Sequence, residues 1–309
     1  MMRMLRAHHF AGFAGGPKLI VLGAVHGNET AGTRGIERVL GELDGGRWRV
    51  ERGSLTLVPV ANPLAYDKGT RSGERNLNRR LLPTEAPRAY EDHIANTLCP
   101  WLAAHDVLLD LHSFRSPGQP FVMRGPADNG GALEPFARAA AEGLLAEHLG
   151  PARIVDGWMS AYAQGAARRR ARGLPDADPS YGIGTTEYMR SQGGYGVTLE
   201  CGQHDDAAGP EVAYRAIRQA VALLGLADLP LAAPAASLQR LSLMTVIDRE
   251  HENDRFAKTW TSFDVLKAGD LIATRADGSS VRAEHDGHIV FPDPNAQPGH
   301  EWFYFAAKK

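Results

Sequence analysis

Three polar side chains at the ends of apolar segments have the types and the spacing of a zinc site. Residues 18–29, KLIVLGAVHGNE, are an apolar run followed by His26 and Glu29, and a second apolar run over residues 107–113, VLLDLHS, ends in His112. Imidazole and carboxylate groups are zinc ligands, and a short-spaced pair with a distant third ligand is typical of a catalytic site that leaves one position for water. The sequence therefore predicts one zinc ion per chain, held by His26, Glu29 and His112.

A third apolar run, residues 196–202 (GVTLECG), ends in another carboxylate, Glu200. The carboxyl ends of parallel strands meet at one edge of a sheet, so we expect Glu200 to reach the same cleft. Simpler roles exist for each group: a histidine at the surface, Glu29 complementing a helix dipole, or Glu200 capping a turn. All four groups end apolar runs, where a charge without a partner is costly, and this coincidence favours the metal site.

Apolar strand-like runs alternate with helical patterns, which predicts an α/β fold. Helical spacing begins after the first strand, with Asn28 as the expected cap. Residues 54–60 are predicted to form a strand. Residues 62–80, which contain Pro and Gly, are predicted to form a long loop, and loops of this length are usually functional. Further helices are predicted around residues 90–102, where Pro100 should kink the helix or begin a second one, and around 133–144 and 212–224.

The composition of the chain changes after the last predicted helix. Residues 227–237, ADLPLAAPAAS, read as a Pro/Ala-rich linker. Short strand-like segments separated by turns follow: LSLMTV, DLIATR, GHIVF and EWFYFA. They predict a small all-β module. We therefore predict a catalytic α/β domain over residues 1–228 and a C-terminal β domain over residues 238–309 that shapes the mouth of the cleft.

The composition is that of an ordinary globular protein: 309 residues, 43% hydrophobic and 23% charged. A net charge of -2 argues against nucleic-acid binding, which needs a surplus of Lys and Arg. Two cysteines are too few for a disulfide framework, residues 1–16 lack the apolar core of a signal peptide, and no apolar segment is long enough to span a membrane. We expect a cytoplasmic protein that binds a small molecule; the sequence leaves open whether it forms a homo-oligomer.

Four segments in this order, GAVHGNETAG, RSGERNLNRRL, DLHS and VTLECG, resemble the succinylglutamate desuccinylase and aspartoacylase family. That family shares the fold of the zinc carboxypeptidases of the carboxypeptidase A type. The resemblance covers essentially the whole chain and implies a mixed-sheet α/β/α domain followed by a small all-β C-terminal domain. It also implies that His26, Glu29 and His112 are zinc ligands, and that Glu200 activates the attacking water and returns the proton to the leaving amine.

The resemblance assigns roles to the predicted loop as well. Arg71 matches an arginine that helps to stabilise the tetrahedral oxyanion, and Asn78 and Arg79 match the pair that binds a substrate carboxylate. Asn76 stands where relatives often carry Asp, a difference that bears on the support and charge around the binding arginine.

The implied activity is hydrolysis of the amide bond of an N-acyl amino acid, with acetate or succinate as the family's precedents for the acyl group. Two other classes of protein fit part of the pattern. A zinc carboxypeptidase acting on small peptides would use the same residues but would need a cleft open to a chain. A metal-binding protein without activity would be expected to lack a base such as Glu200.

Overall fold

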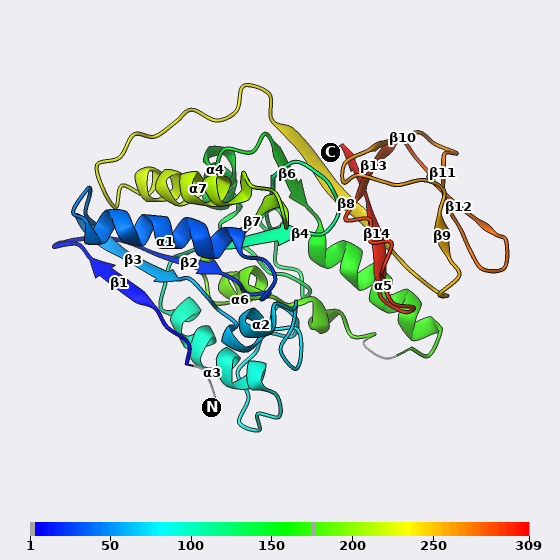
Figure 1. Ribbon diagram of the computed structural model, residues 1–309, viewed down its shortest axis with the longest axis horizontal. Coiled ribbons are helices and arrows are strands. Elements are labelled where there is room, and N and C mark those ends of the chain that lie inside the picture. The colour runs from blue at the N-terminus through cyan, green and yellow to red at the C-terminus, as the bar shows by residue number, and fades with distance from the viewer. Residues whose placement is uncertain (1–3, 175–176, 309) are drawn as a thin grey trace.

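The computed structural model, which describes residues 4–174 and 177–308, is built on one large mixed sheet (Figure 1). The strands of the α/β part are β1 (His8–Ala11), β2 (Ala14–Gly23), β3 (Arg52–Val58), β4 (Val107–Phe114), β5 (Phe121–Met123), β6 (Arg153–Asp156) and β7 (Tyr195–Gln203). The C-terminal strands are β8 (Gln239–Asp248), β9 (Arg255–Phe256), β10 (Val265–Leu266), β11 (Leu271–Thr274), β12 (Ser280–Arg282), β13 (Gly287–Val290) and β14 (Glu301–Lys308). Over the described residues the large sheet has the order β1-β3-β2-β4-β7-β5-β6-β8-β14-β13-β10, and a second sheet has the order β12-β11-β9. The predicted α/β class with additional C-terminal strands is confirmed.

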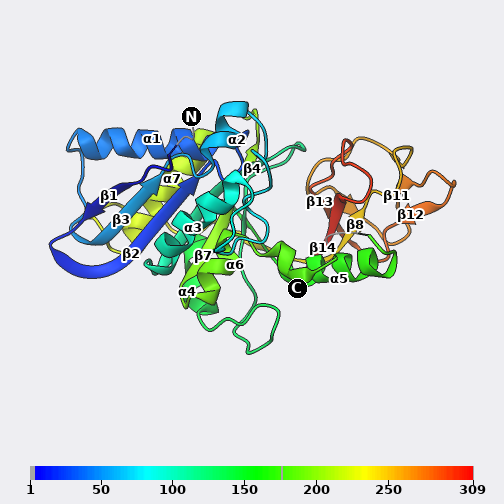
Figure 2. The same ribbon diagram turned by 90° about the horizontal axis from the view of Figure 1, so that it is seen from below.

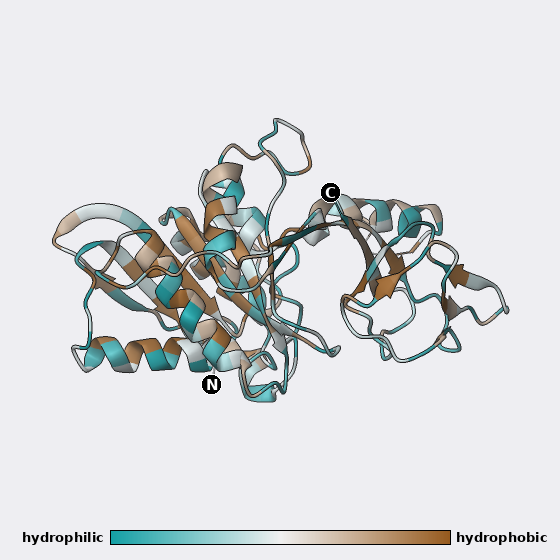
Figure 3. Cartoon of the chain, turned by 90° about the horizontal axis from the view of Figure 1, so that it is seen from above, coloured by the Kyte–Doolittle hydropathy of each residue, from teal (hydrophilic) through white to brown (hydrophobic). Residues whose placement is uncertain are grey.

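Helices cover both faces of the sheet. They are α1 (Ala31–Asp44), α2 (Pro63–Lys68), α3 (Tyr90–Ala103), α4 (Ala139–His148), α5 (Trp158–Ala171), α6 (Thr185–Ser191) and α7 (Gly209–Leu223), with a short 3₁₀ helix over Pro179–Gly182. Helices α1, α4 and α7 share one hydrophobic core with the sheet, and α3 and α6 share a second core on the opposite face. The three layers are visible in Figure 1, and the apolar residues gather on the strands and on the inner sides of the helices in Figure 3.

Strand β2 shows why the apolar runs form the centre of this sheet. Leu19 and Val21 enter the core on the α1 side, whereas Ile20 and Leu22 enter the core on the α3 side. Successive side chains of a strand point to opposite faces, so a parallel strand covered on both faces reads as a continuous apolar run. Strand β2 pairs in parallel with β3 and β4, and β4 pairs in parallel with β7. The carboxyl ends of β2, β4 and β7 therefore lie at one edge.

Two predicted helix starts are wrong. Helix α1 begins at Ala31 with Thr30 as its N-cap, so Asn28 is not the cap. The intervening residues form a turn in which the Glu29 amide donates to the His26 carbonyl oxygen at 3.1 Å. Helix α4 begins at Ala139, after the start predicted for the helix over residues 133–144. Apolar spacing alone does not distinguish a helix from a buried turn before it.

The predicted loop over residues 62–80 is partly helical. Asn62 accepts a hydrogen bond from the Ala65 amide at 3.3 Å and caps α2. The irregular segment therefore begins near Gly69 and continues to α3. Pro100 lies within the last turn of α3, which runs on to Ala103 as one helix.

Residues 227–237 contain neither helix nor strand, as the predicted linker requires. After this segment β8 pairs in parallel with β6, so β8, β14, β13 and β10 extend the large sheet. The C-terminal strands nevertheless lie at one end of the molecule (Figure 2). The division into domains over residues 1–228 and 238–309 stays a prediction. In the part of the chain that is described, no helix has the length and apolar character needed to cross a membrane.

Candidate metal centre

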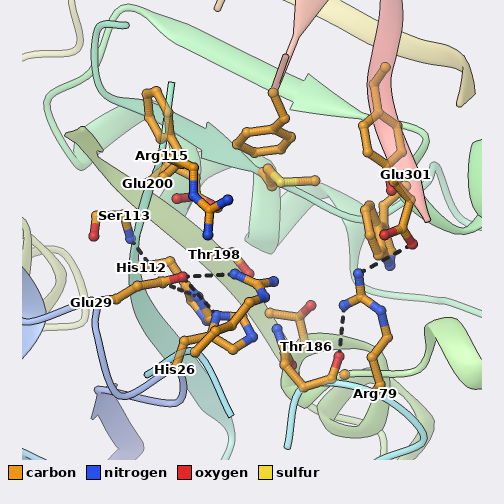
Figure 4. Close-up of a pocket in the computed structure, with 18 of the residues that line it drawn as sticks. His26, Glu29, Arg79, His112, Ser113, Arg115, Thr186, Thr198, Glu200 and Glu301 are labelled. Atoms are coloured by element: carbon orange, nitrogen blue, oxygen red, sulfur yellow. Dashed lines mark hydrogen bonds and ion pairs between the residues drawn. The ribbon is translucent and has the colours of Figure 1, made fainter. Parts of the chain in front are cut away.

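The three predicted ligands converge at the carboxyl edge of the sheet (Figure 4). His26 and Glu29 lie in the turn after β2, and His112 lies near the end of β4, the neighbouring strand. One ligand atom from each residue lies within 4.8 Å of the others, and all three side chains are buried. Within residues 4–174 and 177–308, these are the His, Cys, Asp or Glu side chains that form such a group.

Both histidines point the same ring nitrogen at Glu29. The Nδ1 atoms of His26 and His112 lie 2.9 and 2.8 Å from the two carboxylate oxygens of Glu29. The Nε2 atom of His26 donates to Asn76 Oδ1 at 3.0 Å, and that of His112 donates to Asp110 Oδ2 at 2.9 Å. Acceptors at Nε2 hold the proton there and leave the Nδ1 lone pairs for a metal, as is usual for metal-bound histidines.

These residues fit a zinc ion. Two imidazoles and one carboxylate are the ligand set of several catalytic zinc sites. Two ligands of one zinc ion, each about 2.0–2.2 Å from it, lie at most about 4.4 Å apart, and the ligand atoms of these three residues all lie within 4.8 Å of one another. Burial lowers the pKa of His26 to about 4, so this imidazole is neutral. Burial also lowers the pKa of His112, but the Asp110 and Glu29 carboxylates outweigh it and hold this pKa above its usual value. A metal would compete with the proton on His112.

Asp110 and Asn76 were not singled out as supports of the metal ligands. Asp110 stands two residues before His112, and residues i and i+2 of a strand share a face, so its position could have been inferred. Asp110 also accepts a hydrogen bond from the Thr185 hydroxyl. Asn76 was expected to affect the binding arginine. The structure places its side chain instead against His26, where Oδ1 also accepts the Asn78 amide at 2.9 Å.

Glu200 lies on β7 beside His112 in the parallel register and is buried. Its Oε2 atom has no hydrogen-bond partner among the described residues. Burial raises the pKa of Glu200 to about 8; Glu29 and Asp110 act in the same direction, and His112 and Arg71 oppose them. A buried carboxylate with a raised pKa next to a metal site is suited to accept and return a proton.

Arg71 contacts the metal centre directly from the loop after α2. Its Nη1 atom donates to Glu29 Oε1 at 3.0 Å, 48% of its side chain is exposed, and it lines the pocket. The loop is held by the buried carboxylate of Glu91, which accepts the amides of Gly73 at 2.8 Å and Arg75 at 3.1 Å. Glu91 therefore orders the segment that carries Arg71.

Arg79 lies across the pocket from the metal centre (Figure 4), and Asn78 also lines the pocket. Asn78 Oδ1 accepts the Thr185 amide at 2.9 Å, which leaves the Nδ2 amide as the part of the side chain that can donate to a carboxylate. The Arg79 guanidinium is buried, 4.9 Å from the centre of the Trp158 ring and 3.7 Å from Glu301. The pocket of about 240 Å³ is lined by all the predicted site residues: His26, Glu29, Arg71, Asn78, Arg79, His112 and Glu200.

Comparison with known protein families matches residues 15–141 to the succinylglutamate desuccinylase/aspartoacylase catalytic domain. This confirms the family resemblance found in the sequence motifs. No curated protein sequence matches the chain.

Solved structures share the fold over nearly the full chain. The succinylglutamate desuccinylase/aspartoacylase from Rhodobacter sphaeroides is 17% identical with a TM-score of 0.73, over 99% of this chain and 90% of that one. The ectoine utilization protein EutE (DoeB) from Ruegeria pomeroyi, in its product-bound form, is 18% identical with a TM-score of 0.73, over 98% of this chain and 88% of that one. The succinylglutamate desuccinylase from Vibrio cholerae is 20% identical with a TM-score of 0.69, over 94% of this chain and 82% of that one.

Proposed function

We propose that the protein is a zinc-dependent hydrolase that cleaves the amide bond of an N-acyl amino acid, releasing the free amino acid and a small carboxylate. The observation that carries this proposal is the arrangement of His26, Glu29 and His112, whose ligand atoms lie within 4.8 Å of one another. Glu200 and the buried Arg79 line the same pocket. The family match over residues 15–141 supports a deacylating hydrolase.

His26, Glu29 and His112 would hold one zinc ion, which when bound lowers the pKa of water and polarises an amide carbonyl. Glu200 takes a proton from the attacking water and returns it to the nitrogen of the leaving amine. The C–N bond then breaks with the amine protonated and the acyl group released as a carboxylate. Its burial and its unpartnered Oε2 atom support this role for Glu200.

The loop residues bind and stabilise the reacting groups. Arg71 places positive charge where negative charge develops on the carbonyl oxygen. Its guanidinium has five N–H groups and uses only part of them to bind Glu29, so others can donate to this oxygen. Asn78 and Arg79 bind the carboxylate of the amino acid. A guanidinium suits this group because its two parallel N–H groups match the two carboxylate oxygens.

The C-terminal part of the chain contributes residues to the pocket. Residues of the C-terminal part, including Phe291, Glu301 and Tyr304, line the pocket together with the metal centre. Arg115 of the α/β part and Asp293 of the C-terminal part both line this pocket and form an ion pair at 3.1 Å. The C-terminal residues at the pocket support a small substrate over the peptide of a carboxypeptidase, and the presence of Glu200 supports an enzyme over a metal-binding protein without activity.

The test is hydrolysis of a panel of N-acetyl and N-succinyl amino acids by zinc-loaded and chelator-treated protein, with dipeptides as controls. We expect zinc-dependent release of the free amino acid and little cleavage of dipeptides. Zinc-loaded protein that hydrolyses none of the panel would contradict the proposal, and faster cleavage of dipeptides would favour the carboxypeptidase. We also propose a reducing, cytoplasmic setting, supported by the free, buried state of Cys99 and Cys201.

A further inference from the structure

A second pocket, of about 590 Å³, lies where β6 and β8 begin, beside α4 and α7. These elements lie together along the upper side of the molecule in Figure 1. Among the described residues, none lines both this pocket and the metal pocket. Small-molecule sites are usually about 300–1,000 Å³ in volume. The second pocket is therefore large enough to hold a ligand of its own.

The charged side chains that line this pocket are both arginines. Within residues 4–174 and 177–308, Arg153 and Arg215 line it, and no aspartate or glutamate does. Arg215 pairs with Glu211 at 2.6 Å, but Glu211 also pairs with Arg38, so one carboxylate serves two guanidinium groups. The pocket therefore carries a surplus of positive charge, which favours an anionic ligand.

Arg153, the first residue of β6, is half-buried and forms no ion pair with any residue that the structure describes. Burial lowers the pKa of its guanidinium, and no neighbouring carboxylate opposes this effect. The Nε atom donates to Gln239 Oε1 at 2.7 Å, whereas the two Nη groups donate to no acceptor in the described part of the chain. A partly buried charge without a partner is costly, so it indicates a position that an anion completes.

The neighbours of Arg153 hold its guanidinium in one orientation. The His288 Nδ1 atom donates to the Phe263 carbonyl oxygen at 3.0 Å, so Nε2 of the neutral ring accepts the Gln239 side-chain amide at 3.3 Å. This bond turns Gln239 Oε1 toward Arg153 Nε. Arg153 Cζ also lies 3.9 Å from the centre of the Phe263 ring. Because the guanidinium is fixed before a ligand arrives, binding costs less conformational entropy.

Apolar side chains form the wall opposite in character to the arginines, and they include Leu149, Pro151 and Val212. Val212 belongs to the first turn of α7, whose positive end favours an anion, whereas Leu149 follows the last turn of α4, whose negative end disfavours one. The two helix ends offset each other, so the preference for an anion depends on the arginines. A fixed guanidinium beside an apolar wall is suited to a carboxylate that carries a hydrocarbon group.

We infer that this pocket binds a small organic acid, whose carboxylate pairs with the Nη groups of Arg153 while its hydrocarbon part packs against Leu149, Pro151 and Val212. Such a site is additional to the metal pocket and does not depend on the proposed deacylase reaction. Arg153 begins β6 and Gln239 begins β8, the first strand after the linker. An acid bound there contacts both parts of the chain and stabilises the folded protein.

Binding of 4-fluorobenzoate, measured by fluorine NMR, tests the class of ligand. The neutral 4-fluorobenzamide has nearly the same shape, and we expect it to bind about ten- to hundredfold more weakly, the range for a charge-assisted hydrogen bond. Equal binding of the amide would overturn the pairing with Arg153. Inorganic phosphate should compete poorly because it has no hydrocarbon part, and phosphate that displaces the probe at lower concentration than benzoate would overturn the proposed class.

Four variants assign the binding to this pocket. Arg153→Met should raise the dissociation constant of 4-fluorobenzoate by about ten- to hundredfold. Val212→Trp, which fills the pocket and keeps Arg153, should also raise it at least about tenfold. Arg34→Met, an exposed change outside both pockets, is the matched control and should not alter it. Arg79→Met changes the metal pocket and should leave this binding unchanged.

Unchanged binding in folded Arg153→Met or in folded Val212→Trp, as judged by circular dichroism, would overturn the inference. Loss of binding in Arg79→Met alone would place the acid in the metal pocket and would overturn it equally. Hydrolysis of the acyl amino acids, measured on the same zinc-loaded protein, separates the two proposals. Hydrolysis without binding that depends on Arg153 would support the deacylase and contradict the second site, whereas such binding without hydrolysis would support the second site and contradict the deacylase.

Discussion

Replacing Asn76 by Asp should tighten zinc binding. The Asn76 carbonyl oxygen accepts the proton on His26 Nε2 at 3.0 Å, opposite the Nδ1 atom that faces Glu29. A carboxylate of nearly the same shape keeps this geometry and the bond to the Asn78 amide. It also adds a negative charge that makes His26 a stronger ligand.

The magnitude follows from the change of acceptor. A hydrogen bond between neutral groups contributes about 0.5–1.5 kcal/mol and one to a charged group about 1.5–3 kcal/mol, a difference of about 1–1.5 kcal/mol. This corresponds to a zinc dissociation constant lower by about five- to tenfold. Asn76→Ala removes the acceptor and should raise the constant by about ten- to hundredfold, the usual effect of losing such a partner.

Competition for zinc against a chromophoric chelator at fixed pH would measure both changes. Asn253→Asp, which adds the same charge at an exposed position of the C-terminal part, is the matched control. The reasoning is wrong if Asn76→Asp folds normally but binds zinc no more tightly than the unmodified protein. It is also wrong if Asn76→Ala keeps the original affinity, because the second hydrogen bond of His26 would then be irrelevant to the metal.

Four further outcomes test the remaining assignments. His112→Ala should lose the zinc found by elemental analysis of the unmodified protein, and full occupancy in the variant would contradict the ligand set. Glu200→Gln should keep zinc but lower kcat by about two to four orders of magnitude, and near-normal turnover would exclude Glu200 as the base. Arg79→Met should lower kcat/KM for N-acyl amino acids by about ten- to hundredfold and affect their α-amides little; amides cleaved as well as acids by the unmodified protein would refute carboxylate binding. Burial raises the pKa of Asp254, but hydrogen bonds from Arg275 and three backbone amides outweigh it and lower this pKa from 3.8 to about 2. Because the folded-state pKa lies below the unfolded one, the ionised Asp254 stabilises the folded protein above about pH 4, and this stabilisation disappears as the pH falls through about 2. Asp254→Asn should therefore lower the free energy of unfolding, measured by chemical denaturation, by about 2 kcal/mol at pH 7 and by much less at pH 2. An equal loss at both pH values would refute the charge effect.

The metal centre could be read largely from the sequence. His26, Glu29, His112 and Glu200 each follow an apolar run, and such runs become parallel strands buried on both faces. The carboxyl ends of those strands meet at one edge whatever the details of the helices. The order and length of the apolar runs therefore predict that these four side chains line one pocket, and this prediction does not depend on the conformation of the loops.

The loop between α2 and α3 was harder to interpret from the sequence. Its motif identified Arg71, Asn78 and Arg79 through family resemblance, but not the contacts that hold them. Glu91 orders the loop through backbone amides, and Asn76 turns toward His26. Both contacts depend on a path of the chain that has no periodicity, so residue type alone does not indicate them.

The position of Glu301 and Tyr304 at the far end of the pocket could be learned only from the tertiary structure. Glu301 and Tyr304 lie more than two hundred residues after the loop that carries Arg79, in a segment that the sequence assigned to a separate β domain. They reach the pocket because β8 joins β6 in the large sheet and because a register shift in β14 changes which side chains face inward. A one-residue shift in a strand reverses the direction of every following side chain. Residues 302–307 are a continuous apolar run, which does not show where that shift occurs.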